Sequence, residues 1–168
     1  MHPIVYENRN LLYRYDMRPP SFIIVADRGR LVAYSVDRSV RKPTPRVADT
    51  ADFAEAHQRL AEQVTDKAGS FPISGAGVHA NAASERNSLL AELDTRNFRH
   101  LAGRITSLLQ HHRPEAWAFA APAEINAAIL EGVHPAFRVR LTHVLPRDLI
   151  HVPPGEILNH FSHTPGRI

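Results

Sequence analysis

The stretch FIIVADRGRLVAYSVD, residues 22–37, decides the fold. Residues 22–26 are an apolar run rich in β-branched side chains, and residues 31–36 are a second such run. The turn-forming residues DRGR at 27–30 separate them. Two such runs around a short break predict a β-hairpin in which Gly29 supplies a positive φ. Because the first run is apolar throughout, its strand is expected to be central and covered on both faces.

The length and composition indicate one globular domain with a substantial core. The chain has 168 residues, of which 43% are hydrophobic and 22% are charged. The sequence contains no cysteine, which excludes disulfides, thiol catalysis and cysteine-ligated metals. No stretch has the apolar length of a signal peptide or a membrane span, so we expect a cytoplasmic protein. We divide it into an arm (1–21), a single domain (22–162) and a tail (163–168).

Positive charge is concentrated near the N-terminus. Residues 1–47 carry nine Lys and Arg against four acids, whereas residues 48–112 carry six against eight. Nearly all the basic residues are arginine, whose planar group suits phosphate. Two interpretations stay open: ordinary solvated side chains, or a nucleic-acid-binding face. The second would use Arg28, Arg30, Arg41 and Lys42.

The segment after the hairpin is less regular. Residues 39–47 are basic and broken by proline, which predicts a loop or an irregular third strand. Thr50 is suited to cap a helix that extends to about Asp66, with Phe53, Leu60 and Val64 on its apolar face.

A glycine-rich loop, KAGSFPISGAGVHAN, is expected at residues 67–81. It lacks the Lys-Ser/Thr ending of a phosphate-binding P-loop. It is either an ordinary connector or a functional loop, because glycine permits close approach of another molecule. The candidate binding residues in the loop are Gly75, Gly77 and His79.

The second half predicts alternating helices and strands. The residues after Ser84 are compatible with a short helix, and a longer helix, capped by Asp94 or Thr95, is expected to end near residues 111–114. The other expected elements are a strand at 117–121, a helix at 123–131, a strand at 139–144 and a helix from about 153 to 161. In the helix at 123–131 the inward residues are expected to be Ile125, Ala128 and Ile129, with Gly132 as its stop. A hairpin followed by strand–helix–strand crossovers implies an α/β fold with one mixed sheet and helices packed on it.

These segments resemble, in order and spacing, the bacterial host attachment family, described as required for attachment to host cells. The matching stretches are FIIVADRGRLVAYSV, GSFPISGAGVHA, TRNFRHLAGRITSLL, AWAFAAPAEINAAIL and VRLTHVLPRDLIHVPPGEIL. The family looks like a relative of the central domain of archaeal and eukaryotic peptide-chain release factors. The resemblance implies an RNase H-like, ribosomal-protein-like topology and an association with translation. In those factors a Gly-Gly-Gln tip positions water, but no glutamine occurs here between Gln63 and Gln110, so this release chemistry is not expected.

Catalytic and metal sites are not expected. An RNase H-like nuclease would need converging carboxylates for Mg²⁺, and the available acids are Asp27, Asp37, Glu124 and Asp148. Asp27 lies in the hairpin turn and is better explained as a turn former. The sequence has eleven histidines but no His-Glu-x-x-His motif for zinc and no Gly-x-Ser-x-Gly elbow. We therefore predict no cofactor.

Two functional classes remain, with a weaker third. The first is a non-catalytic binding protein that engages RNA or the ribosome and acts indirectly in attachment. The second is a protein-interaction module that forms a dimer or a surface-attachment complex. The third is a hydrolase of nucleotides or peptidyl-RNA centred on His79.

Overall fold

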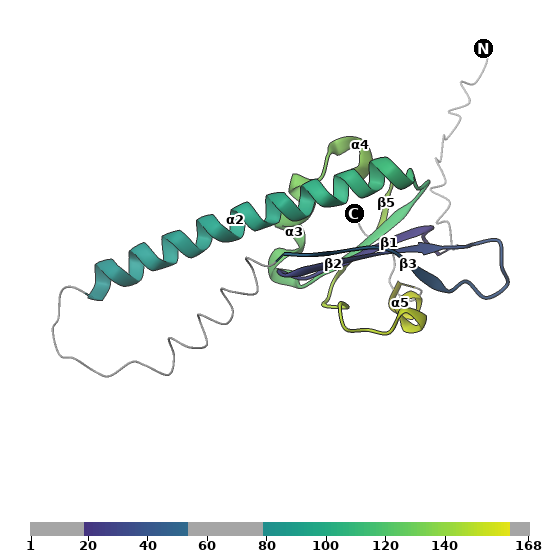
Figure 1. Cartoon of the computed structure of the whole chain (residues 1–168), viewed down its shortest axis with the longest axis horizontal. Helices are drawn as coiled ribbons and strands as arrows, with labels where there is room; N and C mark the ends of the chain where they lie inside the picture. The colour runs from purple at the N-terminus through teal and green to yellow at the C-terminus, as the bar shows by residue number, and fades with distance from the viewer. Residues whose placement is uncertain (1–18, 54–78, 162–168) are drawn as a thin grey trace, which may run out of the picture.

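A single mixed sheet organises the molecule. The computed structural model describes residues 19–53 and 79–161, and in the helix beginning at residue 79 it describes side chains from residue 88 onward. The strand order is β3-β2-β1-β4-β5 (Figure 1). β1, β2 and β3 are antiparallel neighbours, whereas β1, β4 and β5 run parallel. The strands are Phe22–Ala26 (β1), Arg30–Val36 (β2), Pro45–Asp52 (β3), Trp117–Ala121 (β4) and Leu141–Pro146 (β5). The predicted α/β class with one mixed sheet is confirmed.

Helices cover both faces of the sheet. The long helix α2 (His79–His112) and α3 (Ala123–Gly132) lie on one face, and α5 (Pro154–Phe161) lies on the other (Figure 1). A single turn, α4 (Pro135–Arg138), connects α3 toward β5. Alternate residues of β1 enter the two cores: Ile24 packs with α2 and α3, and Ile23 packs with α5. All five residues of β1 are buried, which confirms the predicted central strand.

The hairpin is present, but the prediction for Gly29 is wrong. Among the described residues no glycine has a positive φ. The turn is made instead by Asp27, whose Oδ1 accepts hydrogen bonds from the backbone N–H of Gly29 at 2.7 Å and of Arg30 at 2.6 Å. An aspartate that bonds to the backbone two residues on can form a tight turn without a left-handed residue. This confirms Asp27 as a turn former.

The third strand continues through the expected helix start. Thr50 pairs with Val32 in β3, so it does not cap a helix, and Asp52 is the last strand residue rather than part of a first helical turn. Pairing with β2 provides hydrogen-bond partners for the backbone N–H and C=O groups that would otherwise have bonded within the predicted helix. The rest of that helix and residues 67–78 of the glycine-rich loop lie outside the described residues.

A bulge in β3 turns Asp49 toward α2. Tyr34 pairs with Val47, but Ala33 pairs with Asp49, which leaves Ala48 as an extra residue. Side chains of a strand alternate between the two faces of the sheet, so one extra residue makes every later side chain point to the opposite face. As a result, Arg104 Nη2 of α2 donates to both carboxylate oxygens of Asp49, at 2.7 and 2.8 Å.

One helix replaces the two that were expected between residues 82 and 110. α2 runs without a break from His79 to His112, so neither Asp94 nor Thr95 is an N-cap. Thr95 lies inside the helix, where its hydroxyl donates to the carbonyl of Ala91 at 2.9 Å. The predicted end is confirmed: Arg113 has a φ of 47° and Pro114 follows it.

The second half confirms most of the predicted elements, with two corrections. On α3, Ala128 is exposed, and the third buried position is Asn126. β5 begins at Leu141 rather than at residue 139, and Val139 is 82% exposed. β4 and α5 lie where the sequence placed them.

Candidate functional site

The hairpin end of the sheet holds two of the candidate arginines, and both have acidic partners. Arg28 Nη2 lies 3.3 Å from Asp94 Oδ2 of α2, and Arg30 Nε lies 3.6 Å from Asp52 Oδ1 of β3. The guanidinium carbon of Arg28 is also 6.0 Å from the centre of the Phe98 ring. These contacts offset much of the positive charge that the sequence assigned to a binding face.

Backbone contacts fix this end against α2. The side chain of Asn97 is buried, and its Nδ2 donates to the carbonyl oxygen of Arg28 at 2.6 Å. The backbone N–H of Phe53 donates to the carbonyl of Gly29 at 2.7 Å. The turn is therefore part of the packed framework.

Arg41 and Lys42 lie at the opposite end of β2, in the loop that leads to β3. Seven strand residues separate the two ends, a distance of roughly 20 Å. Both side chains are exposed, and neither has an ion-pair partner within residues 19–53 and 79–161. The structure thus separates Arg28 and Arg30 from Arg41 and Lys42 instead of bringing the four together.

The glycine-loop candidates fall at the limit of the described chain. Gly75 and Gly77 lie outside it. His79 is the first residue of α2, and its side chain is not among those described. The helix places residue 79 at the end of α2 that projects beyond the sheet (Figure 1).

The acidic residues that could serve as Mg²⁺ ligands in a nuclease do not form one cluster. Asp27 follows β1 and Glu124 lies in the first turn of α3, whereas Asp37 lies at the other end of β2. Hydrogen bonds from the hydroxyl and N–H of Ser39 lower the pKa of Asp37. Among the residues described, no three His, Asp or Glu side chains are grouped closely enough to hold a metal ion.

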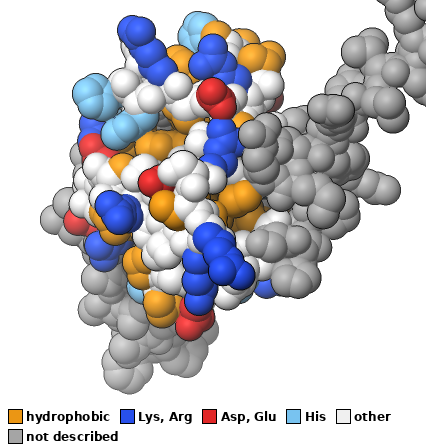
Figure 2. Space-filling view, turned by 90° about the vertical axis from the view of Figure 1, so that its right-hand side faces the viewer, with side chains coloured by type: hydrophobic (Ala, Val, Ile, Leu, Met, Phe, Trp, Pro, Cys, Tyr) orange, Lys and Arg blue, Asp and Glu red, His pale blue; other side chains and the backbone are white. Residues whose placement is uncertain are grey.

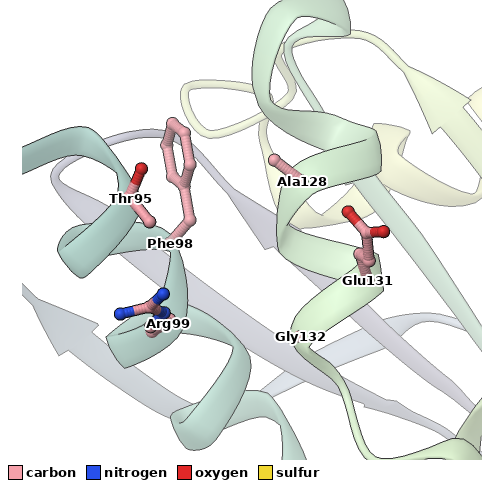
Figure 3. A pocket seen from close by; sticks show the side chains of 6 residues that line it. All are labelled: Thr95, Phe98, Arg99, Ala128, Glu131 and Gly132. Carbon is pink, nitrogen blue, oxygen red and sulfur yellow. The ribbon is translucent and has the colours of Figure 1, made fainter. Parts of the chain in front are cut away.

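A groove between α2 and α3 was not predicted from the sequence. It has a volume of about 390 Å³. Thr95, Phe98 and Arg99 line its α2 side, and Ala128, Glu131 and Gly132 line its α3 side (Figure 3). The helices approach closely at its base, because a Cβ built on Gly132 would lie 2.8 Å from the Cβ of Ala102. In the sequence, the one sign of this close approach is Gly132 at the end of α3, which by itself predicts a helix stop.

Arg99 and Glu131 give the groove two opposite charges, one on each helix. No ion pair joins them, and both residues are exposed. The groove is shallow and open to solvent, with the Phe98 ring as its largest apolar surface (Figure 3).

A comparison with protein-family models decides the family. The model for proteins required for attachment to host cells matches residues 22–161, from the first residue of β1 to the last residue of α5. The chain belongs to this family. A comparison with curated proteins gives no match.

The family match confirms the resemblance of the sequence to the host attachment family. It covers the hairpin, the sheet and all the described helices of this host attachment family member. It connects the chain with attachment but names no partner. None of the described helices has both the length and the apolar character needed to cross a lipid bilayer.

Proposed function

We propose that this host attachment family member is a non-catalytic binding protein that engages RNA or the ribosome and acts indirectly in attachment. The observation that carries the proposal is the exposed basic pair Arg41 and Lys42 on the β2–β3 loop, which have no acidic partner in the described structure. Exposed cations without acidic partners are available to contact phosphates. The arginine-rich composition agrees with this type of ligand.

The fold gives a second line of support through the proposed kinship with release factors. We infer an RNase H-like topology from three antiparallel strands followed by two parallel crossover strands, in the order β3-β2-β1-β4-β5. A long helix, α2, follows the glycine-rich stretch in the sequence. The loop itself lacks the Gly-Gly-Gln tip, so the proposal is for binding without peptide release.

Binding to RNA should depend strongly on salt. We expect the full chain to bind purified ribosomes or a labelled RNA, with an affinity that falls about ten-fold or more between 50 and 200 mM salt, because several phosphate contacts release counterions. Sedimentation with ribosomes and fluorescence anisotropy with RNA measure this. Absence of binding at low salt, or an affinity that salt leaves unchanged, would contradict the proposed function.

A dimer is the second candidate, and one feature of α2 favours it. Leu89 is 56% exposed, and Leu90 and Leu93 on the same half of the helix are only partly buried. Residues three or four apart are neighbours on a helix surface, so Leu93 lies beside both Leu89 and Leu90, and the three form an apolar strip that a second copy of this chain would cover.

Light scattering after gel filtration tests the dimer. The proposal predicts a dimer that Leu89→Glu with Leu93→Glu converts to a monomer, while Ala91→Glu, at an exposed position on the other side of the helix, leaves it intact. A wild-type monomer at high concentration would rule this candidate out.

A further inference from the structure

Three segments that are far apart in the sequence bring basic residues to one end of the sheet. They are the β2–β3 loop with the first residues of β3, the turn after α2, and α4 with the turn that leads to β5. Together they carry seven Arg and Lys against two acids, and we refer to this set as the basic end: Arg38, Arg41, Lys42, Arg46, Arg113, Arg138 and Arg140. The two acids are Asp37 and Glu115.

Hydrogen bonds establish that these segments are neighbours. Arg38 Nη2 lies 2.7 Å from Glu115 Oε2, which ties the β2–β3 loop to the turn after α2. The N–H of Trp117 donates to the carbonyl of Arg140 at 3.0 Å, and the Nη1 of Arg140 donates to the carbonyl of Pro114 at 3.5 Å. Figure 2 views this end of the molecule directly and shows Lys and Arg side chains spread across it.

Acidic partners are scarce at this end. Glu115 is paired with Arg38, and Asp37 is occupied by Ser39. Arg41, Lys42, Arg113 and Arg138 are exposed and have no ion pair in the described structure, whereas Arg46 is exposed but interacts electrostatically with Asp37. At the hairpin end, by contrast, Arg28 and Arg30 each have an aspartate. The partial negative charge at the C-terminus of α2 is only about half an elementary charge, so it does not neutralise the cluster.

We propose that the basic end is the surface of this protein that binds the phosphate backbone of RNA. The inference rests on the proposed function and extends it, because it adds Arg113 and Arg138 from parts of the sequence with no net basic excess. It leaves Arg28 and Arg30 out of the binding surface, because their contacts at the hairpin end are structural. Six of the seven cations are arginine, which donates in a bidentate manner to phosphate.

The chemistry of this end favours RNA over a lipid surface. His111, His112 and His134 are exposed there, and imidazole rings stack on unpaired bases. The exposed large apolar residues in or next to these segments are Val40, Val47 and Val139, at 46%, 55% and 82%. Membrane-surface helices use Trp, Phe and Leu on a continuous face, and three valines provide much less apolar area.

The test compares two double variants that lose the same charge. Arg113→Gln with Arg138→Gln removes two cations from the basic end, and Arg96→Gln with Arg147→Gln removes two exposed cations elsewhere. The probe is a fluorescein-labelled single-stranded RNA of 20 nucleotides, titrated by anisotropy from 50 to 200 mM salt with the full chain. Sedimentation with phosphatidylserine vesicles forms a parallel arm, and circular dichroism checks that each variant is folded.

The expected results follow from the number of phosphates contacted. At 0.1 M salt the basic-end variant should bind at least ten-fold more weakly than wild type, and its salt slope should be smaller by about 1.4 for two lost contacts. The Arg96/Arg147 control should change affinity less than three-fold. Equal losses in the two variants, or no loss in the basic-end variant, would overturn the inference while leaving RNA binding itself intact. Binding of vesicles but not of RNA by wild type would overturn both.

Discussion

Asn126 shows how one buried polar residue holds two strands at the edge of the α3 layer. It is 5% exposed, and its Nδ2 donates to the carbonyls of Ala121 at the end of β4, at 3.2 Å, and of Leu145 in β5, at 3.0 Å. Buried carbonyls that lose a donor raise the free energy of the folded state. Asn126 therefore fixes the register between the end of β4 and β5. It also fixes the position of α3 on these strands.

Replacing Asn126 by Leu, which has the same branching and number of side-chain heavy atoms but no hydrogen-bond donor, should destabilise the protein. We expect the free energy of unfolding to fall by roughly 1–3 kcal/mol, because the carbonyl groups lose their buried donor. Urea unfolding followed by circular dichroism measures the change. Ala127→Leu, at an exposed neighbouring position, should change stability by less than about 0.5 kcal/mol. Equal stability of Asn126→Leu and wild type would show that the amide has no structural role.

Gly132 is needed for close packing between helices rather than for an unusual backbone angle. An alanine Cβ at this position would lie 2.8 Å from the Cβ of Ala102, and neither atom can rotate away. We expect Gly132→Ala to cost about 1–3 kcal/mol through overpacking, although alanine is the better helix former. The matched control is Gly103→Ala in α2, where a Cβ meets nothing within 4 Å. That control should be stabilised by up to about 1 kcal/mol. A stabilised Gly132→Ala would contradict the packing argument.

At the scale of elements, α2 has two parts with different support. From Asn97 onward it buries Leu101, Ile105, Leu108 and Leu109 against the sheet, whereas residues 88–96 contain no fully buried side chain. A helix rises 1.5 Å per residue, so the first 18 residues of α2 extend for about 27 Å. This projecting half places residue 79 well away from the sheet (Figure 1).

Proline should therefore act differently in the two halves of α2. Proline inside a helix removes a hydrogen bond and clashes with the preceding turn, at a cost of about 3 kcal/mol or more. In Ala91→Pro we expect a loss of helical signal with little change in the urea midpoint, because the projecting half can unwind without opening the core. Gly103→Pro, placed where the helix packs on the sheet, should lower the midpoint strongly. Similar midpoints for the two variants would show that both halves share one cooperative unit.

The sequence predicted the elements whose signals are local and missed those that depend on distant partners. The hairpin, β4 and α5 follow from apolar runs bounded by Gly, Pro and Asp, so their positions were predicted within a residue or two. Thr50 has the local features of a helix cap, but its ladder pairing with Val32 overrides them. Asp94 and Thr95 look like caps in the sequence for the same reason, while the helix continues through them. The basic end could not be predicted either. It combines three segments that meet only in the fold, and charge counts over continuous stretches of sequence treat them separately.

At the scale of the whole molecule, the two faces of the sheet are covered unequally. α2 and α3 contribute many of the large side chains on one face, while the other face is closed by α5 and the segment before it through Leu149, Ile157 and Phe161. His143 of β5 lies on this thinner side, with its ring centre 6.4 Å from that of Phe161. Its Nδ1 is 3.0 Å from the hydroxyl of Thr142.

Acid should weaken the α5 side through His143. Burial lowers the pKa of His143 below its ordinary value of 6.5, so the folded state holds this ring neutral at pH values where the unfolded chain binds a proton. The resulting contribution to stability is present above pH 6.5 and is lost as the pH falls from there toward the lowered pKa of the folded state. Urea midpoints measured between pH 8 and pH 5 should therefore decrease more in wild type than in His143→Phe, which keeps a ring against Phe161 but cannot be protonated. His151→Phe, at an exposed site in the loop before α5, is the matched control and should retain the wild-type slope. Parallel pH profiles for wild type and His143→Phe would show that protonation of this ring does not couple α5 to the sheet.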